Sequence, residues 1–199
     1  MPSPHSSKLA GAVALAAILI ASGCDAVLTT AQLPEVKEDR ILGQWKDLGT
    51  PGSKPEPDPL LIKFDQGQYW AGSADDFAKG KASAFILARV GSTLIAQSAS
   101  KQCDEFGVEK GKPCFSLNRI QLMGDKMSWY DFDSAQMAKD SISGALNVAH
   151  TLHRERRQSG TFENAMLIPV DAPALQQFLT SYVTHRGVFH LTGRLERVH

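Results

Sequence analysis

Three consecutive pairs of short apolar segments, each pair joined by a turn that contains glycine, occupy the middle of the chain. The pairs are 60–64 with 68–71, 84–90 with 93–97, and 115–123 with 126–130. Apolar runs of this length on either side of such a turn are typical of β-hairpins. Consecutive hairpins pack as an antiparallel meander that closes into a barrel or sandwich. The sequence therefore predicts a mainly β (α+β) protein, whose meander forms a small barrel or half-barrel.

The first strand of the third pair has an irregular apolar pattern. Phe115 and Leu117 occupy odd positions, whereas Ile120 and Leu122 occupy even ones. Since side chains alternate between the two faces of a strand, this shift has two explanations. Either a β-bulge lies near 118–119, or the strand is buried on both faces.

The last third of the chain has a mixed pattern that adds helices to the predicted β domain. Residues 134–142 fit a short helix capped by Asp133 or Ser134, and 145–153 fit a strand and a helix equally well. Strands are predicted at 166–170 and 188–198.

The clearest helix is predicted at 171–187. Asp171 is its expected N-cap, Pro173 suits the first turn, and Gly187 suits the left-handed stop. Its apolar residues recur with helical spacing at Leu175, Phe178, Leu179, Tyr182 and Val183.

An uncharged apolar run at 9–21 stands close to the N-terminus. The run is shorter than the roughly 20 residues that a membrane-spanning helix needs, and it matches the apolar core of a secretory signal. The small residues 21–23 then precede Cys24 directly. A secretory signal with an incidental cysteine, or an uncleaved short anchor, would give the same run.

The sequence Ala21-Ser22-Gly23-Cys24 resembles the lipobox of bacterial lipoproteins, with alanine where leucine is commonest. The resemblance implies that a signal peptide, 1–23, is removed and that Cys24 carries fatty acyl chains such as palmitate. Asp25 resembles the signal that keeps lipoproteins of enteric bacteria in the inner membrane. We therefore expect a lipid-anchored, periplasm-facing protein of the bacterial cell envelope, with the inner membrane slightly favoured.

The domain boundaries follow from this prediction. Residues 24–40 are polar and contain Pro34, so we expect a lipidated tether there. Residues 41–199 then form a single β domain with a helical C-terminal third, which opens with a strand at 41–45. Four prolines make 50–59 a loop, because proline removes backbone donors and restricts φ.

The remaining two cysteines, Cys103 and Cys114, are expected to pair. Export places them in an oxidising compartment, where two leftover cysteines usually form a disulfide. The alternative is a redox pair or a set of metal thiolates, but the CxxC spacing that favours both is absent. We therefore predict a structural disulfide that closes the loop between two strands.

The histidines and carboxylates give only a weak catalytic or metal-binding pattern. His150 and His153 could share a metal on a helix, but on a strand they would face opposite ways. The HExxH, GxSxG and phosphate-loop motifs are absent from the sequence, so we expect no metal or other cofactor. The acidic pairs Asp75-Asp76 and Asp131-Phe132-Asp133 are interpreted as loop or cap residues.

Adjacent aromatic residues on two predicted strands indicate a partner surface. Tyr69-Trp70 and Trp129-Tyr130 must each place one ring inward and one outward. We expect Trp70 and Tyr130, with the basic residues Arg154, Arg156 and Arg157, as the candidate partner surface. The same basic run could also adhere to an anionic membrane.

A short strand with Gly43-x-Trp45, a long loop and a series of hairpins resembles the lipocalin-like lipoproteins of bacteria over residues 41–131. The resemblance implies a lipocalin-like barrel. The predicted helices after residue 131 depart from that pattern, so an open ligand cavity does not follow. No ligand residue is carried over.

These features favour a non-enzymatic, membrane-anchored lipoprotein that binds a protein partner or a small apolar ligand. An inhibitor or immunity role in the periplasm is one form of such binding. The main alternative is an envelope hydrolase that uses His150 or His153 with an acidic partner. Because 21 basic residues balance 21 acidic ones, we expect no nucleic-acid partner.

Overall fold

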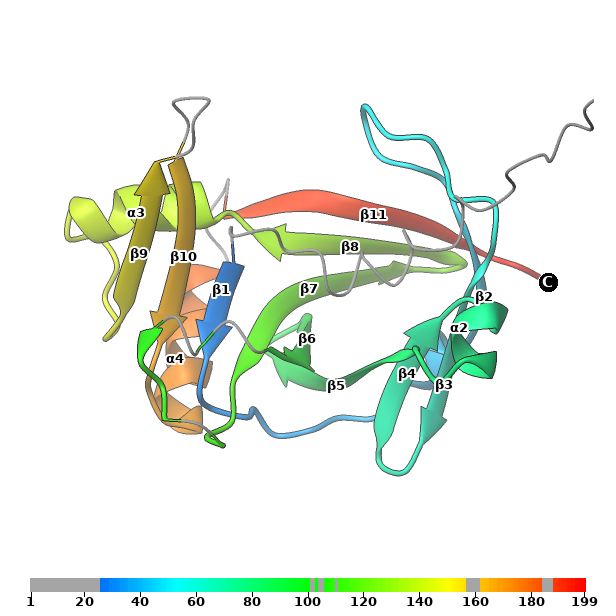
Figure 1. Cartoon of the computed structure of the whole chain (residues 1–199), viewed down its shortest axis with the longest axis horizontal. Helices are drawn as coiled ribbons and strands as arrows, with labels where there is room; N and C mark the ends of the chain where they lie inside the picture. The colour runs from blue at the N-terminus through cyan, green and yellow to red at the C-terminus, as the bar shows by residue number, and fades with distance from the viewer. Residues whose placement is uncertain (1–25, 101–102, 104–105, 110, 157–161, 184–187) are drawn as a thin grey trace, which may run out of the picture.

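Eight strands close into an antiparallel barrel in the order in which they follow along the chain (Figure 1). They are β2 (Gly43–Asp47), β3 (Leu60–Asp65), β4 (Gln68–Gly72), β5 (Ser83–Val90), β6 (Thr93–Ala99), β7 (Phe115–Met123), β8 (Lys126–Phe132) and β11 (Phe189–Arg197). The last strand, β11, pairs with β8 on one side and with β2 on the other, which closes the barrel. The structure is a computed structural model that describes residues 26–100, 103, 106–109, 111–156, 162–183 and 188–199. The predicted small lipocalin-like barrel is confirmed.

The three predicted hairpins are the β3–β4, β5–β6 and β7–β8 pairs. The turn glycines Gly91 and Gly124 have φ angles of 58° and 59°, in the left-handed region that other residues rarely adopt. The hairpin signal in the sequence therefore has a direct backbone cause.

The predicted bulge in β7 is wrong, and the alternative explanation holds. The strand keeps one continuous register with β6 and with β8 through residues 118–119. Leu117 packs outside the barrel, whereas Ile120 packs inside it. The apolar pattern shifts because β7 is buried on both faces. The irregular register belongs instead to β11, between Leu191 and Gly193.

The barrel interior is filled by large side chains. Trp45, Tyr69, Phe85 and Trp129 are each at most 2% exposed and belong to one apolar cluster. The Phe85 ring lies 5.4 Å from the Tyr69 ring and 5.7 Å from the Trp129 ring. An eight-stranded barrel is just wide enough for such filling. The interior is thus a core of packed aromatic rings.

The expected tether is wrong for residues 26–40, which are packed against the domain. Strand β1 (Ala26–Thr29) is buried throughout, pairs parallel with β10 (Phe162–Ile168) and antiparallel with β7. Strand β9 (Thr151–Arg156) pairs with β10 and completes a three-stranded extension of the barrel sheet. The sequence analysis predicted a tether because this segment is mostly polar and its strand partners, β7 and β10, lie far from it along the chain.

After β1 the chain runs along the barrel instead of leaving it. The Gln97 side chain holds this segment by accepting from Leu33 N at 2.7 Å and donating to Ala31 O at 3.0 Å. A 3-10 turn, η1 (Asp39–Ile41), follows, and the Ile41 side chain enters the barrel core.

Glu38 at the start of this turn forms two ion pairs. Its carboxylate accepts from Arg40 at 2.7 Å and from Arg89 at 3.1 Å. The hydrogen bond from Arg40 is the main reason why the pKa of Glu38 falls to about 2.

The helices form as their caps predict. The side chains of Asp133 and Asp171 cap α3 (Ser134–Ile142) and α4 (Ala172–Tyr182), accepting from backbone N–H groups at 2.8 and 2.9 Å. The predicted helix end at 184–187 lies outside the described residues. A short helix, α2 (Ala74–Ala78), was not predicted, although Ser73 and Asp76 form a capping box.

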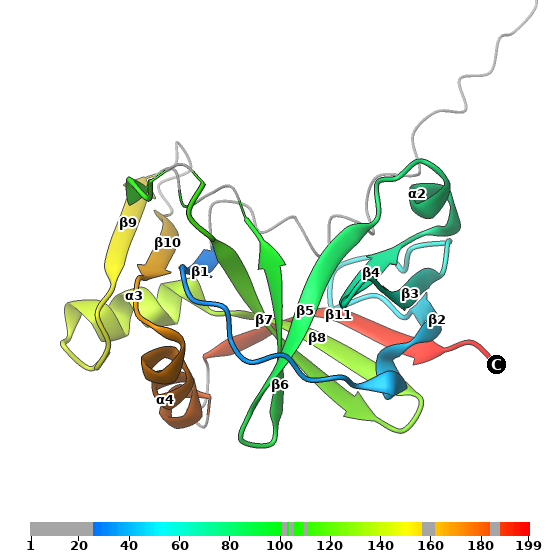
Figure 2. The same ribbon diagram turned by 90° about the horizontal axis from the view of Figure 1, so that it is seen from below.

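Helices α3 and α4 cover a second core outside the barrel, on the side of the β1–β10–β9 extension (Figure 2). This core joins the outer face of the barrel strands to the helices. Its members include Val27, Ala88, Ile95, Leu117, Phe132, Met137, Met166, Ile168, Leu175, Phe178 and Leu179. In the described part of the chain, no helix has the length and apolar character to cross a membrane.

Candidate functional site

A surface cleft of about 490 Å³ lies between α3, the segment 145–149 and α4. It is lined by both polar and apolar side chains, including Asp140, Asn147, Val148, Gln177, Ser181 and Tyr182. The segment 145–149 reaches this place because the N–H groups of Ala145 and Leu146 donate to the Asp140 carbonyl at 2.8 and 3.1 Å. Residues 145–149, where the sequence fitted a strand and a helix equally well, therefore form an irregular segment that lines the cleft and leads into β9.

Asp140 joins the two helices across the cleft. Its carboxylate accepts from Gln136 Nε2 at 2.8 Å and from the Tyr182 hydroxyl. Burial raises the pKa of Tyr182, and the hydrogen bond to Asp140 and the charge of that carboxylate act in the same direction. Tyr182 therefore remains a protonated donor that holds α4 to α3.

A serine and a histidine lie in contact beside this cleft. Ser141 Oγ is 2.7 Å from His150 Nε2, and His150 Nδ1 is 2.7 Å from Val148 O. A carbonyl oxygen only accepts, so Nδ1 must carry the hydrogen. In the neutral ring, Nε2 then accepts a hydrogen bond from the Ser141 hydroxyl. A serine nucleophile and its general base make the same contact. The group that orients the ring is a backbone carbonyl, not a carboxylate.

His153 is not brought to this site. It lies exposed on β9, and its ring is 6.0 Å from the Phe106 ring. The two histidines of the HxxH pattern therefore do not act together: His150 lies just before β9 and His153 lies on it. In the parts of the chain that the structure describes, no group of three or more His, Cys, Asp or Glu residues could hold a metal ion.

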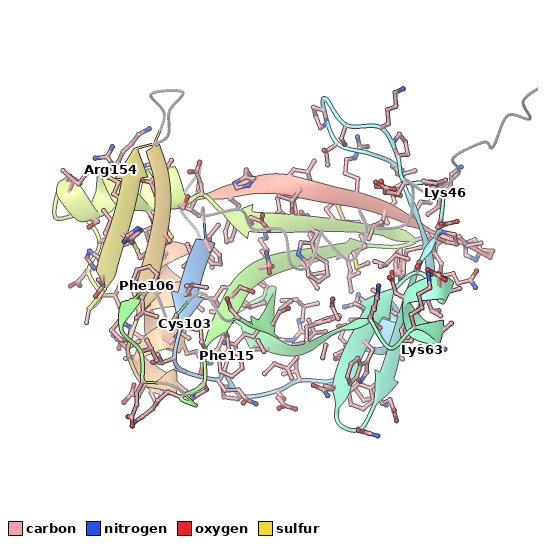
Figure 3. All side chains as sticks on the ribbon, viewed as in Figure 1. Lys46, Lys63, Cys103, Phe106, Phe115 and Arg154 are labelled. Carbon is pink, nitrogen blue, oxygen red and sulfur yellow. A yellow bond between two sulfur atoms is a disulfide. The ribbon has the colours of Figure 1, made fainter. Side chains whose placement is uncertain are left out.

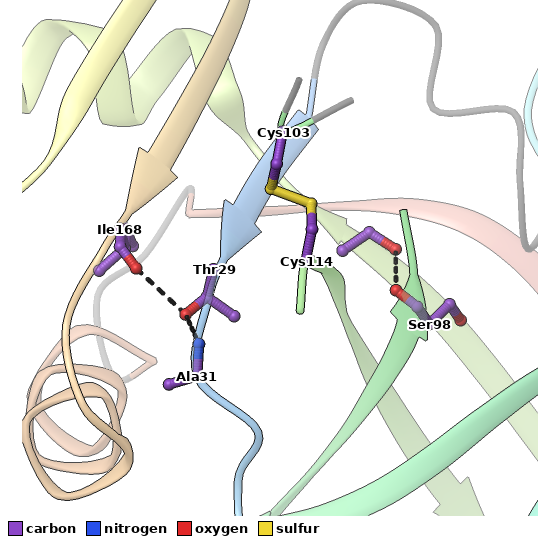
Figure 4. The surroundings of a disulfide bond; sticks show 7 residues. Thr29, Ala31, Ser98, Cys103, Cys114 and Ile168 are labelled. Carbon is purple, nitrogen blue, oxygen red and sulfur yellow. Dashed lines mark hydrogen bonds between the residues drawn. A yellow bond between two sulfur atoms is a disulfide. The ribbon is translucent and has the colours of Figure 1, made fainter. Parts of the chain in front are cut away.

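The predicted cysteine pair is present at disulfide distance, and it covers one face of the sheet extension (Figure 4). The sulfur atoms of Cys103 and Cys114 are 1.94 Å apart, and their Cα atoms are 6.0 Å apart. Both residues are buried against an apolar cluster that contains Ala26, Leu28 and Leu167. The disulfide therefore has a structural position over β1, while Cys24 lies outside the described residues.

The predicted partner residues do not form one surface. Tyr69 and Trp129 point into the barrel, so Trp70 and Tyr130 point outward as expected, and both are half-buried. However, three strands separate β4 from β8 in either direction around the barrel, which puts Trp70 and Tyr130 on opposite sides.

The basic part of that prediction lies on a third element. Arg154 is exposed on β9 (Figure 3), Arg156 is the last residue of that strand, and Arg157 lies outside the described residues. The expected patch is thus divided among three places, because adjacency in sequence does not determine which strands are neighbours.

Sequence reasoning missed a partly buried polar cluster in β7, β8 and β11. The Asp131 carboxylate accepts from Asn118 Nδ2 at 2.5 Å and from Thr192 Oγ1 at 3.4 Å, with His190 Nε2 3.8 Å away. Burial raises the pKa of Asp131, and the charge of His190 offsets only part of this effect. The Asp131-Phe132-Asp133 pattern could not distinguish a half-buried aspartate of the barrel from a helix cap, which is the role of Asp133.

Comparison with protein-family models, curated proteins and solved structures finds no match to this chain. The assignment of a function therefore depends on the geometry of the cleft, the filled barrel and the N-terminal sequence.

Proposed function

We propose that this protein is a lipoprotein of the bacterial cell envelope, anchored through acylated Cys24, whose non-enzymatic role is to bind a protein partner. Support for the anchor comes from the apolar run at 9–21 and the lipobox-like residues that follow it.

The filled barrel is the observation that carries the choice of a protein partner over a small apolar ligand. Ligand pockets are concave and enclose most of a small molecule. In this barrel the equivalent space holds Trp45, Tyr69, Phe85 and Trp129. A protein partner needs only a surface, and the cleft between α3 and α4 offers both apolar and hydrogen-bonding groups.

Lipidation is tested by mass. Cells treated with a signal peptidase II inhibitor should accumulate a heavier, unprocessed form, and Cys24→Ser should remove the acyl chains. A mature protein of unchanged mass after inhibition would contradict the anchor.

Partner binding is tested by site-specific photocrosslinking in the native host. A photoreactive residue at Gln177, which is exposed on α4 and lines the cleft, should give a defined adduct. The matched control is the same residue at Gln66 in the β3–β4 turn, on the far side of the molecule. Adducts of equal yield at both positions, or none at Gln177, would refute binding at the cleft.

A second candidate function, an envelope hydrolase, is favoured by one observation, the contact between Ser141 and His150 beside the cleft. Such a pair would make Ser141 reactive toward a fluorophosphonate, an electrophile that labels activated serines. Ser141→Ala should then abolish labelling, whereas Ser143→Ala should preserve it, because Ser143 Oγ only donates to Asp140 O. Absence of labelling on the wild-type protein would eliminate this candidate.

A further inference from the structure

Asp140 is the one charged residue among the described residues that line the cleft between α3 and α4. Other carboxylates of this chain, such as Glu38 and Asp75, pair with a lysine or an arginine. No ion pair formed by the residues that the structure describes includes Asp140. Its partners, Gln136 and Tyr182, are uncharged donors. The cleft therefore presents a negative charge to whatever enters it.

The Asp140 carboxylate can accept more hydrogen bonds than it receives. Its two oxygens offer about four acceptor positions, and each oxygen accepts one bond from the described side chains. Lys139 precedes it on α3, but successive side chains of a helix point about 100° apart, and Lys139 does not line the cleft. Half-buried Asp140 is thus open to donors from a ligand.

The walls around this charge are largely apolar. Val148 and Val170 pack against the core under the two helices. The Phe178 ring is buried and stacks on the Tyr182 ring, with 5.0 Å between their centroids. Apolar walls together with one carboxylate suit a side chain that has a hydrocarbon stem and a cationic head.

The size and the polar groups of the cleft favour arginine as that side chain. Its volume of about 490 Å³ lies within the roughly 300–1,000 Å³ of pockets that enclose small molecules. Besides Asp140, the side-chain amides of Asn147 and Gln177 line the cleft and supply carbonyl acceptors. A guanidinium has five donors in one plane, so it can use several acceptors at once, whereas an ammonium is a compact point charge.

We infer that the cleft binds an arginine side chain of the protein partner, with its guanidinium at Asp140 and its stem against Val148 and Val170. This inference rests on the proposed function, because it names the group that the partner must present at the cleft. Arginine is one of the residues that carry most of the binding energy in protein interfaces.

The test adds N-acetylarginine amide to the purified protein and follows the backbone amide signals of Asn147, Val148 and Gln177 by NMR. These signals should shift until the cleft is saturated. The neutral isostere N-acetylcitrulline amide should bind about 10-fold more weakly, which is the lower end of what a hydrogen bond to a charged group contributes.

Asp140→Asn removes the charge but keeps the size of the side chain and its ability to bond with Gln136 and Tyr182. It should lower the affinity for the arginine compound about 10-fold. The matched control, Asp75→Asn, removes an exposed carboxylate of α2, at the opposite end of the molecule from α3 (Figure 1), and should leave the affinity within twofold.

Equal affinity of the wild type for the arginine and citrulline compounds, or no shift with either, would overturn the inference. This comparison needs no substitution, so it is decisive even if Asp140→Asn lowers stability. Tighter binding of the polyamine putrescine would also overturn it, because the cleft would then select a free cation. If the photocrosslink from Gln177 still captured a partner in either case, partner binding would stand, so the two proposals fail separately.

Discussion

Replacing Leu28 by alanine tests whether the segment after the lipobox-like residues is a folded strand. Leu28 is fully buried in β1 and packs in the cluster of Cys103, Cys114 and Leu167. A residue in a flexible tether would tolerate the change, because surface substitutions alter stability by less than about 0.5 kcal/mol.

The expected cost follows from the carbon atoms removed. Leucine has three more carbon groups than alanine, and each buried group contributes about 0.8 kcal/mol, or about 2.4 kcal/mol together. The cavity that remains adds to this loss, which places the free energy of unfolding about 3 kcal/mol below the wild-type value.

Urea unfolding of the chain from residue 24 onward measures this difference. With a slope of about 2 kcal/mol per molar urea, the midpoint should fall by about 1.5 M. Gln32→Ala is the control, because Gln32 is exposed in the segment that follows β1. A Leu28→Ala midpoint equal to that of Gln32→Ala would refute the packing of β1 against the disulfide cluster.

Four further predictions address the disulfide, two carboxylates and the cleft. Replacing both disulfide cysteines with serine should lower the free energy of unfolding by about 3 kcal/mol in urea, because the bond closes a short loop. The pKa of Glu38 is lowered to about 2, so its ion pairs stabilise the fold above pH 4.5 and lose this effect as the pH falls toward 2. The urea midpoint of Glu38→Gln should therefore depend less on acid pH than that of the wild type. The pKa of Asp131 is raised in the folded state, so the wild type loses stability as the pH rises above 3.8 and this carboxyl ionises. Asp131→Asn lacks this loss, so its stability relative to the wild type should increase with pH in the same assay. Tyr182→Phe removes the hydrogen bond between α4 and α3 and should cost about 1–2 kcal/mol of unfolding free energy, whereas an unchanged midpoint would contradict a structural role for that bond.

Local signals predicted much of the fold because their physical causes are local. Turn glycines located the hairpins, and the Asp133 and Asp171 caps located α3 and α4. The capping box of Ser73 and Asp76 could have located α2 in the same way. Such signals act within four residues of chain, so a single sequence contains them in full.

The candidate site was less accessible to this reasoning. His150 was identified as a candidate, but its partner Ser141 was not, because the contact depends on how the segment 145–149 folds back on α3. The expected surface of Trp70, Tyr130 and the arginines failed for a related reason. The alternation of side chains predicted that both aromatic residues point outward, but only barrel closure decides that β4 and β8 are opposite one another.

The sequence by itself determined the hairpin meander and the helix starts and predicted the cysteine pair, since each depends on residues that lie close together along the chain. Tertiary structure alone decided that the polar-looking segment after Cys24 contains a buried strand. The residue pairs of that strand, such as Ala26 with Ala165, are joined by hydrogen bonds between segments at opposite ends of the chain. A run of four residues is too short for its apolar pattern to predict a strand. Its burial becomes favourable only when β10, β7 and the disulfide loop surround it.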